Sequence, residues 1–180
     1  MDLITREELG DYLGEQIIED DIADQVIGHV SRRMARFCDR DDWGGSSSRT
    51  EYLDGGSKFL MVRYWPITSV TNIWDDPEHE WATNTVLASD DYWIAKDPEA
   101  NGHILLDYTP TCSPWSMKVT YTGGYSATGS IPQDLKTAAL MQCKTQVYQM
   151  QTTLGNQEDL EFLAEVKELL VKYKRSRLFA

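Results

Sequence analysis

Hydrophobic residues recur at helical spacing near both ends of the chain. Ile22, Val26, Val30, Met34 and Phe37 follow one another at intervals of four, four, four and three residues, which is typical of an amphipathic helix with one apolar face. Similar periodicity, with capping and breaking residues, predicts helices at about Arg6–Leu13, Asp21–Asp39, Pro132–Gln151 and Glu158–Arg175.

The first of these helices has a clear predicted start. Thr5 and Glu8 stand three residues apart, which is the spacing of a capping box. In that motif the hydroxyl and the carboxylate each accept a hydrogen bond from a backbone N–H group that the helix leaves unpaired.

Between the second and third helices the pattern changes to an alternation of apolar and polar residues. Met117, Val119 and Tyr121 alternate with polar residues and predict a half-buried strand that ends at Gly123-Gly124. Strands are predicted at Glu51–Leu53, Phe59–Val62, Ser69–Trp74, Tyr92–Ala95, Ile104–Tyr108 and Met117–Thr122.

Two details of this β-rich region carry further predictions. The first two strands flank the turn Asp54–Ser57, which predicts a hairpin. Five of the six tryptophans lie between Trp65 and Trp115 or at its ends, and this density predicts a small sheet whose core is filled by a few large rings.

These elements predict an α+β fold in which both chain ends form a helical bundle and a small antiparallel β domain is inserted between helices 2 and 3. A chain of 180 residues is expected to be a single domain. Within it, residues 1–42 form the N-terminal helices, 43–128 the β-rich insertion, and 129–180 the C-terminal helices and basic tail.

Composition restricts the class of protein. The net charge of −12 disfavours sequence-specific DNA recognition, which needs a basic surface. The chain has no apolar run of about 18 residues and no signal-peptide pattern at its start, so no membrane segment is expected. Its three cysteines form no CxxC pair and suggest a reduced, cytosolic history.

Candidate catalytic and metal chemistry is weak throughout. The cluster Asp75, Asp76, Glu78, His79 and Glu80 matches neither an EF-hand nor a zinc spacing, and a solvated turn is the favoured interpretation. No serine or cysteine stands in a recognisable nucleophile context, and no phosphate-binding loop is present. The sequence therefore predicts neither an enzyme nor a metal or other cofactor.

Charge segregation along the chain is informative. The first 24 residues carry nine acids and one base, and arginines recur every four residues at Arg32, Arg36 and Arg40. Complementarity to helix dipoles explains this pattern and is favoured from charge alone. The alternative is an assembly in which an acidic face of one subunit meets a basic face of the next.

Several segments, taken in order, resemble a known family. They are the opening ITREELGDYLG, the hairpin Thr50–Gly56, Tyr64–Val70 (YWPITSV), Val119–Tyr125 (VTYTGGY) and Ile131–Lys136 (IPQDLK). In this order they resemble the head–tail connector (adaptor, or head-completion) family of tailed bacteriophages. The match covers nearly the whole chain, although the segment between Ile73 and Trp115 is longer and richer in tryptophan than the family pattern.

The resemblance implies a non-enzymatic structural protein of the virion neck, made in the host bacterial cytoplasm. It implies a homo-oligomeric ring, a dodecamer, that lies beneath the portal protein and carries the stopper or tail-terminator protein. Genomic DNA would pass through the ring without sequence-specific binding, and no membrane would be involved.

Interface residues are expected from the resemblance and the charge pattern together. Family members dock onto the portal through the C-terminal helix and tail, which here corresponds to Lys172, Lys174, Arg175, Arg177, Leu178 and Phe179. The expected inter-subunit residues are Arg32, Arg36, Arg40, Glu7, Glu8 and Asp11. The alternative function is a ligand- or carbohydrate-binding module of a tail-associated protein, acting through the tryptophan-rich insertion.

Overall fold

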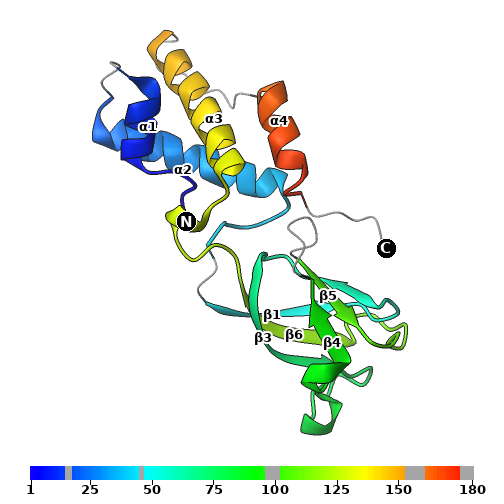
Figure 1. The fold of residues 1–180 in the computed structure, drawn as a ribbon. Helices are drawn as coiled ribbons and strands as arrows, with labels where there is room; N and C mark the ends of the chain where they lie inside the picture. Colours follow the sequence, from blue (N-terminus) through cyan, green and yellow to red (C-terminus); the bar gives the residue numbers. More distant parts are fainter. Residues whose placement is uncertain (15–17, 45–46, 96–101, 153–160, 175–180) are drawn as a thin grey trace. The chain divides into compact units, whose positions relative to one another are not determined.

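The computed structural model describes residues 1–14, 18–44, 47–95, 102–152 and 161–174 (Figure 1). They form four α-helices and two three-stranded antiparallel sheets, so the predicted α+β class is confirmed. The helices are α1 (Arg6–Leu13), α2 (Asp20–Phe37), α3 (Gln133–Thr152) and α4 (Ala164–Val171). The strands are β1 (Ser48–Leu53), β2 (Phe59–Met61), β3 (Ile67–Asp75), β4 (Tyr92–Ile94), β5 (His103–Leu106) and β6 (Met117–Gly123).

The chain divides into two compact units. One unit, called here the helical unit, comprises Met1–Trp43 and Ala127–Arg175, and the other, called the β unit, comprises Gly44–Ser126. Each unit has its own buried apolar residues.

Helix α3 is the centre of the helical unit, because it contacts α1, α2 and α4 (Figure 1). Val30 and Met34 of α2 and Leu135 and Cys143 of α3 are fully buried, as the apolar spacing of both helices predicts. Trp43 is also buried, and its indole Nε1–H donates a hydrogen bond to the Ser31 carbonyl at 2.9 Å. The buried residues thus come from segments on both sides of the β unit in the sequence.

Helix α4 is shorter than predicted. It begins at Ala164, and its N-cap residue, Leu163, has no side chain that can accept a capping hydrogen bond. The Leu163 N–H donates to the side-chain oxygen of Gln142 on α3 at 3.3 Å, a contact that sequence periodicity cannot anticipate. Residues 158–160 and 175 of the predicted helix lie outside the described residues.

The predicted hairpin around Asp54–Ser57 is wrong. Strand β1 pairs with β6, and β2 pairs with β5, so the two strands belong to different sheets with orders β1-β6-β3 and β2-β5-β4. The turn residues contact a distant loop, since Gly55 N–H donates to Ser113 O at 2.9 Å and Asp54 Oδ1 accepts from Trp115 N–H at 2.9 Å. These contacts direct the chain from one sheet to the other.

The core of the β unit differs from the predicted cluster of large rings. It is mainly aliphatic and includes Leu60, Ile73, Ile104 and Val119, with the two tyrosines Tyr64 and Tyr121. Trp65 is buried, whereas Trp93 and Trp115 are exposed and Trp74 and Trp81 are half-buried. Much of the tryptophan surface is therefore available to solvent rather than enclosed.

Candidate functional site

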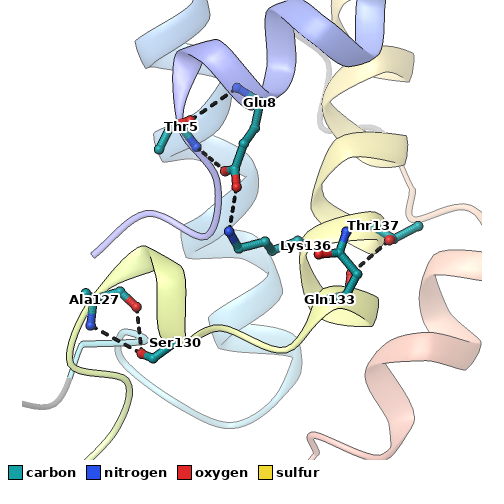
Figure 2. Close-up of polar contacts among 7 residues, drawn as sticks. All are labelled: Thr5, Glu8, Ala127, Ser130, Gln133, Lys136 and Thr137. Atoms are coloured by element: carbon teal, nitrogen blue, oxygen red, sulfur yellow. Dashed lines mark hydrogen bonds and ion pairs between the residues drawn. The ribbon is translucent and has the colours of Figure 1, made fainter.

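The first candidate surface is the acidic start of the chain, where Glu8 is held inside the helical unit (Figure 2). Thr5 Oγ1 accepts the Glu8 N–H at 3.1 Å, and Glu8 Oε2 accepts the Thr5 N–H at 2.8 Å, so the predicted capping box is confirmed. The other carboxylate oxygen, Oε1, forms an ion pair with Lys136 Nζ on α3 at 2.5 Å. Glu8 thus joins α1 to α3.

These contacts also determine how Glu8 titrates. Partial burial raises the pKa of the Glu8 carboxyl. The hydrogen bonds from Lys136 and from the Thr5 backbone together lower the pKa by more than burial raises it, so it lies below its ordinary value of 4.5. Glu7 and Asp11, in contrast, are exposed and stand four residues apart on α1. Of the three acids expected at a subunit contact, Glu8 is therefore already used within the subunit.

Replacing Glu8 by glutamine should lower the free energy of unfolding by about 1 kcal/mol at pH 7, because the ion pair and part of the cap are lost. A lowered pKa stabilises the folded state above the ordinary pKa of 4.5, and this stabilisation is lost as the pH falls through the lowered value. Urea unfolding of wild type and Glu8→Gln should therefore converge in acid. The exposed Glu7→Gln should behave like wild type throughout, and a pH-independent difference for Glu8→Gln would contradict the assignment.

The second candidate surface is the arginine series of α2, which the structure divides. Arg32 and Arg36 are exposed on one side of the helix, one turn apart. In the described part of the chain, neither side chain makes an ion pair or hydrogen bond. They therefore form a basic pair that faces solvent.

Arg40 does not belong to this exposed series. The helix ends at Phe37, and Asp39 takes a left-handed backbone conformation with φ of 58°, which turns the chain. Arg40 is consequently only 2% exposed, and its guanidinium lies 4.6 Å from the centre of the Trp43 ring. Arg40 lies three residues beyond the end of α2, so its side chain does not continue the exposed row of Arg32 and Arg36.

The third candidate surface is the basic end of α4. Lys172 forms an ion pair with Asp134 in the first turn of α3, and the Tyr173 hydroxyl donates to Asp134 Oδ1 at 2.6 Å. The ammonium of Lys174 lies 5.2 Å from the centre of the Phe37 ring. The remaining expected portal-binding residues lie outside the described residues: Arg175, Arg177, Leu178 and Phe179.

The acidic cluster of the β unit is exposed from Glu78 to Glu80, as expected for a solvated turn, but Asp76 is buried. Asp76 is 3% exposed, and its carboxylate accepts hydrogen bonds from Glu78 N–H at 3.1 Å and Trp81 N–H at 2.6 Å. Desolvation raises the pKa of Asp76, but these backbone donors lower it more, so it stays below its ordinary value. Within the described ranges, no group of three or more His, Cys, Asp or Glu side chains is arranged to hold a metal ion.

Sequence reasoning missed a group of rings on the outer face of sheet β1-β6-β3. Tyr52, Lys118 and Trp74 are cross-strand neighbours in one row of this sheet. The alternation of apolar and polar residues shows which face of its own strand each residue occupies. That the three residues form one row follows only from the pairing of β1, β6 and β3.

None of the helices in the described segments is long and apolar enough to cross a membrane.

Comparison with known proteins gives similarity of fold. No protein-family model matches this chain, and no curated protein matches its sequence. A chain from the neck of an empty gene transfer agent (GTA) particle, computed with C6 symmetry, matches with a TM-score of 0.61 and 13% identity, over 98% of this chain and 91% of that chain. A chain from the virion of the native GTA particle matches with a TM-score of 0.62, 13% identity and the same coverage.

A third match comes from the neck of the native GTA particle computed with C12 symmetry. It has a TM-score of 0.53 and 14% identity, over 96% of this chain and 88% of that chain. Because all three identities are below the range where function can be transferred, the similarity shows the fold alone. This chain has the fold of a protein chain found in gene transfer agent particles, in structures of both the neck and the virion.

Proposed function

We propose that this chain is a structural protein of a virion neck, namely the head–tail adaptor. In this role a homo-oligomeric ring, a dodecamer, lies beneath the portal protein and extends the DNA channel. The ring gives the stopper or tail-terminator protein a platform for attachment.

The observation that supports this proposal is the similarity of fold along almost the whole chain. The match covers 98% of this chain and involves both units, and two of the matched structures are necks computed with C6 and C12 symmetry. The ordered motifs from the N-terminus to Ile131–Lys136 point to the same class of protein independently of the fold.

The ring contact is proposed to join the basic pair of α2 to the acids of α1 on the neighbouring subunit. Arg32 and Arg36 are separated by one helical turn, as are Glu7 and Asp11, so two helices laid side by side can match both charges at once. Each subunit presents one acidic and one basic pair, which is the arrangement needed for a head-to-tail ring. Glu8 and Arg40 are left out because their side chains are engaged inside the subunit.

The portal contact is proposed to involve Lys174 and the segment that follows it, since the ammonium of Lys172 is paired with Asp134 inside the subunit. Arg175 and Arg177 supply charge, and Leu178 and Phe179 supply an apolar anchor. The same ion pair fixes the end of α4 on the first turn of α3.

The charge of the chain suits a channel through which DNA passes. A protein that neutralises phosphates with lysine and arginine binds DNA strongly through counterion release, which would hinder passage. A chain with 29 acidic and 17 basic residues avoids this kind of binding.

Cryo-electron microscopy of the virion neck tests the proposal. We expect a ring of this chain directly beneath the portal, with the helical units of neighbouring subunits in contact. A neck that lacks this chain, or contains it only in the tail, would overturn the proposed function.

Deletion of Arg175–Ala180 should weaken binding to the portal at least about tenfold, which corresponds to about 1.4 kcal/mol, and leave the thermal stability unchanged. Binding can be measured by surface plasmon resonance on immobilised portal. Two full-length controls separate the contributions: Arg175→Ala with Arg177→Ala removes charge, and Leu178→Ala with Phe179→Ala removes the anchor. Equal affinity of the truncated and complete chains would contradict the assignment.

A further inference from the structure

We propose that the outer face of sheet β1-β6-β3 is a docking site for an arginine-bearing segment of a protein other than this chain. The site consists of Tyr52, His79 and Trp81, with Lys118 and Trp74 beside them, and is called here the aromatic surface. All residues of this surface belong to the β unit, and the inference does not depend on ring formation.

The rings of the aromatic surface converge around Trp81. Its ring centre lies 5.4 Å from that of Tyr52, and His79 stacks on it at 5.6 Å with 11° between the ring planes. Tyr52 remains 52% exposed, so the group opens to solvent through this tyrosine. Aromatic residues gathered on an exposed surface are the side chains most enriched in protein-binding sites.

An unusual backbone holds these rings in place. His79 and Trp81 have φ angles of 60° and 55°, in the left-handed region that bulky residues rarely occupy. The buried carboxylate of Asp76 accepts the Trp81 N–H, and His79 Nε2 lies 3.2 Å from the Pro114 carbonyl oxygen. Because the loop is fixed before binding, little conformational entropy would be lost when a partner docks.

Charge indicates what kind of side chain fits. Glu78 and Glu80 are exposed and flank His79 in the sequence, so the loop carries negative charge beside the rings. The ammonium of Lys118 lies 4.4 Å from the centre of the Trp74 ring and 5.5 Å from that of Trp81, so one cation already contacts these rings, and the two exposed glutamates outnumber it. A guanidinium is the cation that stacks best on aromatic rings and also pairs with carboxylates.

Other occupants fit less well. Nucleic acid would bring phosphates to a surface that carries the two exposed glutamates Glu78 and Glu80. A sugar ring needs an open aromatic face, whereas His79 covers one face of Trp81. The observations therefore favour a basic protein segment over the carbohydrate considered from the sequence.

The test uses the complete protein and two synthetic peptides, Ac-Leu-Arg-Leu-Arg-NH2 and its counterpart with citrulline in place of arginine. Binding is followed by the NMR signal of the Trp81 indole N–H. We expect a saturable shift with the arginine peptide and at least fivefold weaker binding of the citrulline peptide. Tyr52→Ala and the double variant Glu78→Gln, Glu80→Gln should each weaken binding at least threefold, whereas Tyr52→Phe should retain it.

Trp93→Ala is the matched control, because Trp93 is also 52% exposed but lies on β4 in the other sheet. It should leave the titration unchanged. Equal responses to both peptides, or wild-type binding by Tyr52→Ala and by the glutamate double variant, would overturn the proposal. A shift of the Trp81 signal with maltohexaose but not with the arginine peptide would also overturn it, in favour of a carbohydrate site.

Discussion

Replacing Gly123 by alanine should destabilise the protein by about 3 kcal/mol. A Cβ atom at this position would lie 2.0 Å from the carbonyl oxygen of Tyr64 and 2.8 Å from Cε2 of Tyr121, both far below a van der Waals contact. Neither neighbour can easily retreat, since the Tyr64 N–H donates to the Tyr121 hydroxyl at 3.0 Å within the core. The adjoining Gly124 N–H donates to Pro66 O at 2.9 Å and holds the backbone in place.

Urea unfolding measures this effect, and Gly129→Ala is its control. A Cβ atom at Gly129 would meet nothing within 4 Å, so that variant should remain within about 0.5 kcal/mol of wild type. The packing interpretation would be wrong if the two alanine variants had the same stability. The result matters for assembly because Gly123 ends the strand that joins β1 to β3.

Reversing the basic pair of α2 should prevent ring formation. In Arg32→Glu with Arg36→Glu, two attractive contacts at each proposed subunit boundary become repulsive, which costs about 2 kcal/mol per boundary. This corresponds to about thirtyfold weaker association at each contact, repeated around the ring. Native mass spectrometry of the chain assembled on its portal measures the effect, which should be larger at low than at high salt because exposed charges are screened.

A charge swap makes this prediction specific. Glu7→Arg with Asp11→Arg should also prevent assembly, whereas the combination of all four substitutions should restore it. Lys58→Glu with Arg63→Glu changes the net charge equally in the β unit and should leave assembly intact. If the fourfold variant fails to assemble although its thermal stability equals that of wild type, the proposed pairing is incorrect.

The sequence predicted those elements whose signals are local. The apolar spacing of α2 and the Thr5–Glu8 capping box involve residues within a few turns of each other, and both predictions are confirmed. The pairing of β1 with β6 joins Glu51 to Val119, and no short-range pattern contains that information. The residues Asp54–Ser57 do form a turn between β1 and β2, but a turn signal does not specify whether the two flanking strands pair with each other.

The candidate interfaces show the same limit. Arg32 and Arg36 could be recognised because both lie within one regular helix, whereas the burial of Arg40 depends on a single left-handed residue, Asp39. The role of Glu8 depends on Lys136, which is 128 positions away in the chain. The aromatic surface required three strands and a loop to be placed together, and its individual residues carry no recognisable motif.

The first turn of α3 binds side chains from both α1 and the end of α4. Lys136 binds Glu8 from α1, and Asp134, two residues earlier, binds Lys172 and Tyr173 from the end of α4. A pulling force applied to the C-terminal segment would therefore be carried first by polar contacts at the start of α3 rather than by the apolar face of the short α4. Because both attachments include ion pairs, high salt should weaken the contacts of α1 and of the end of α4 with α3 together.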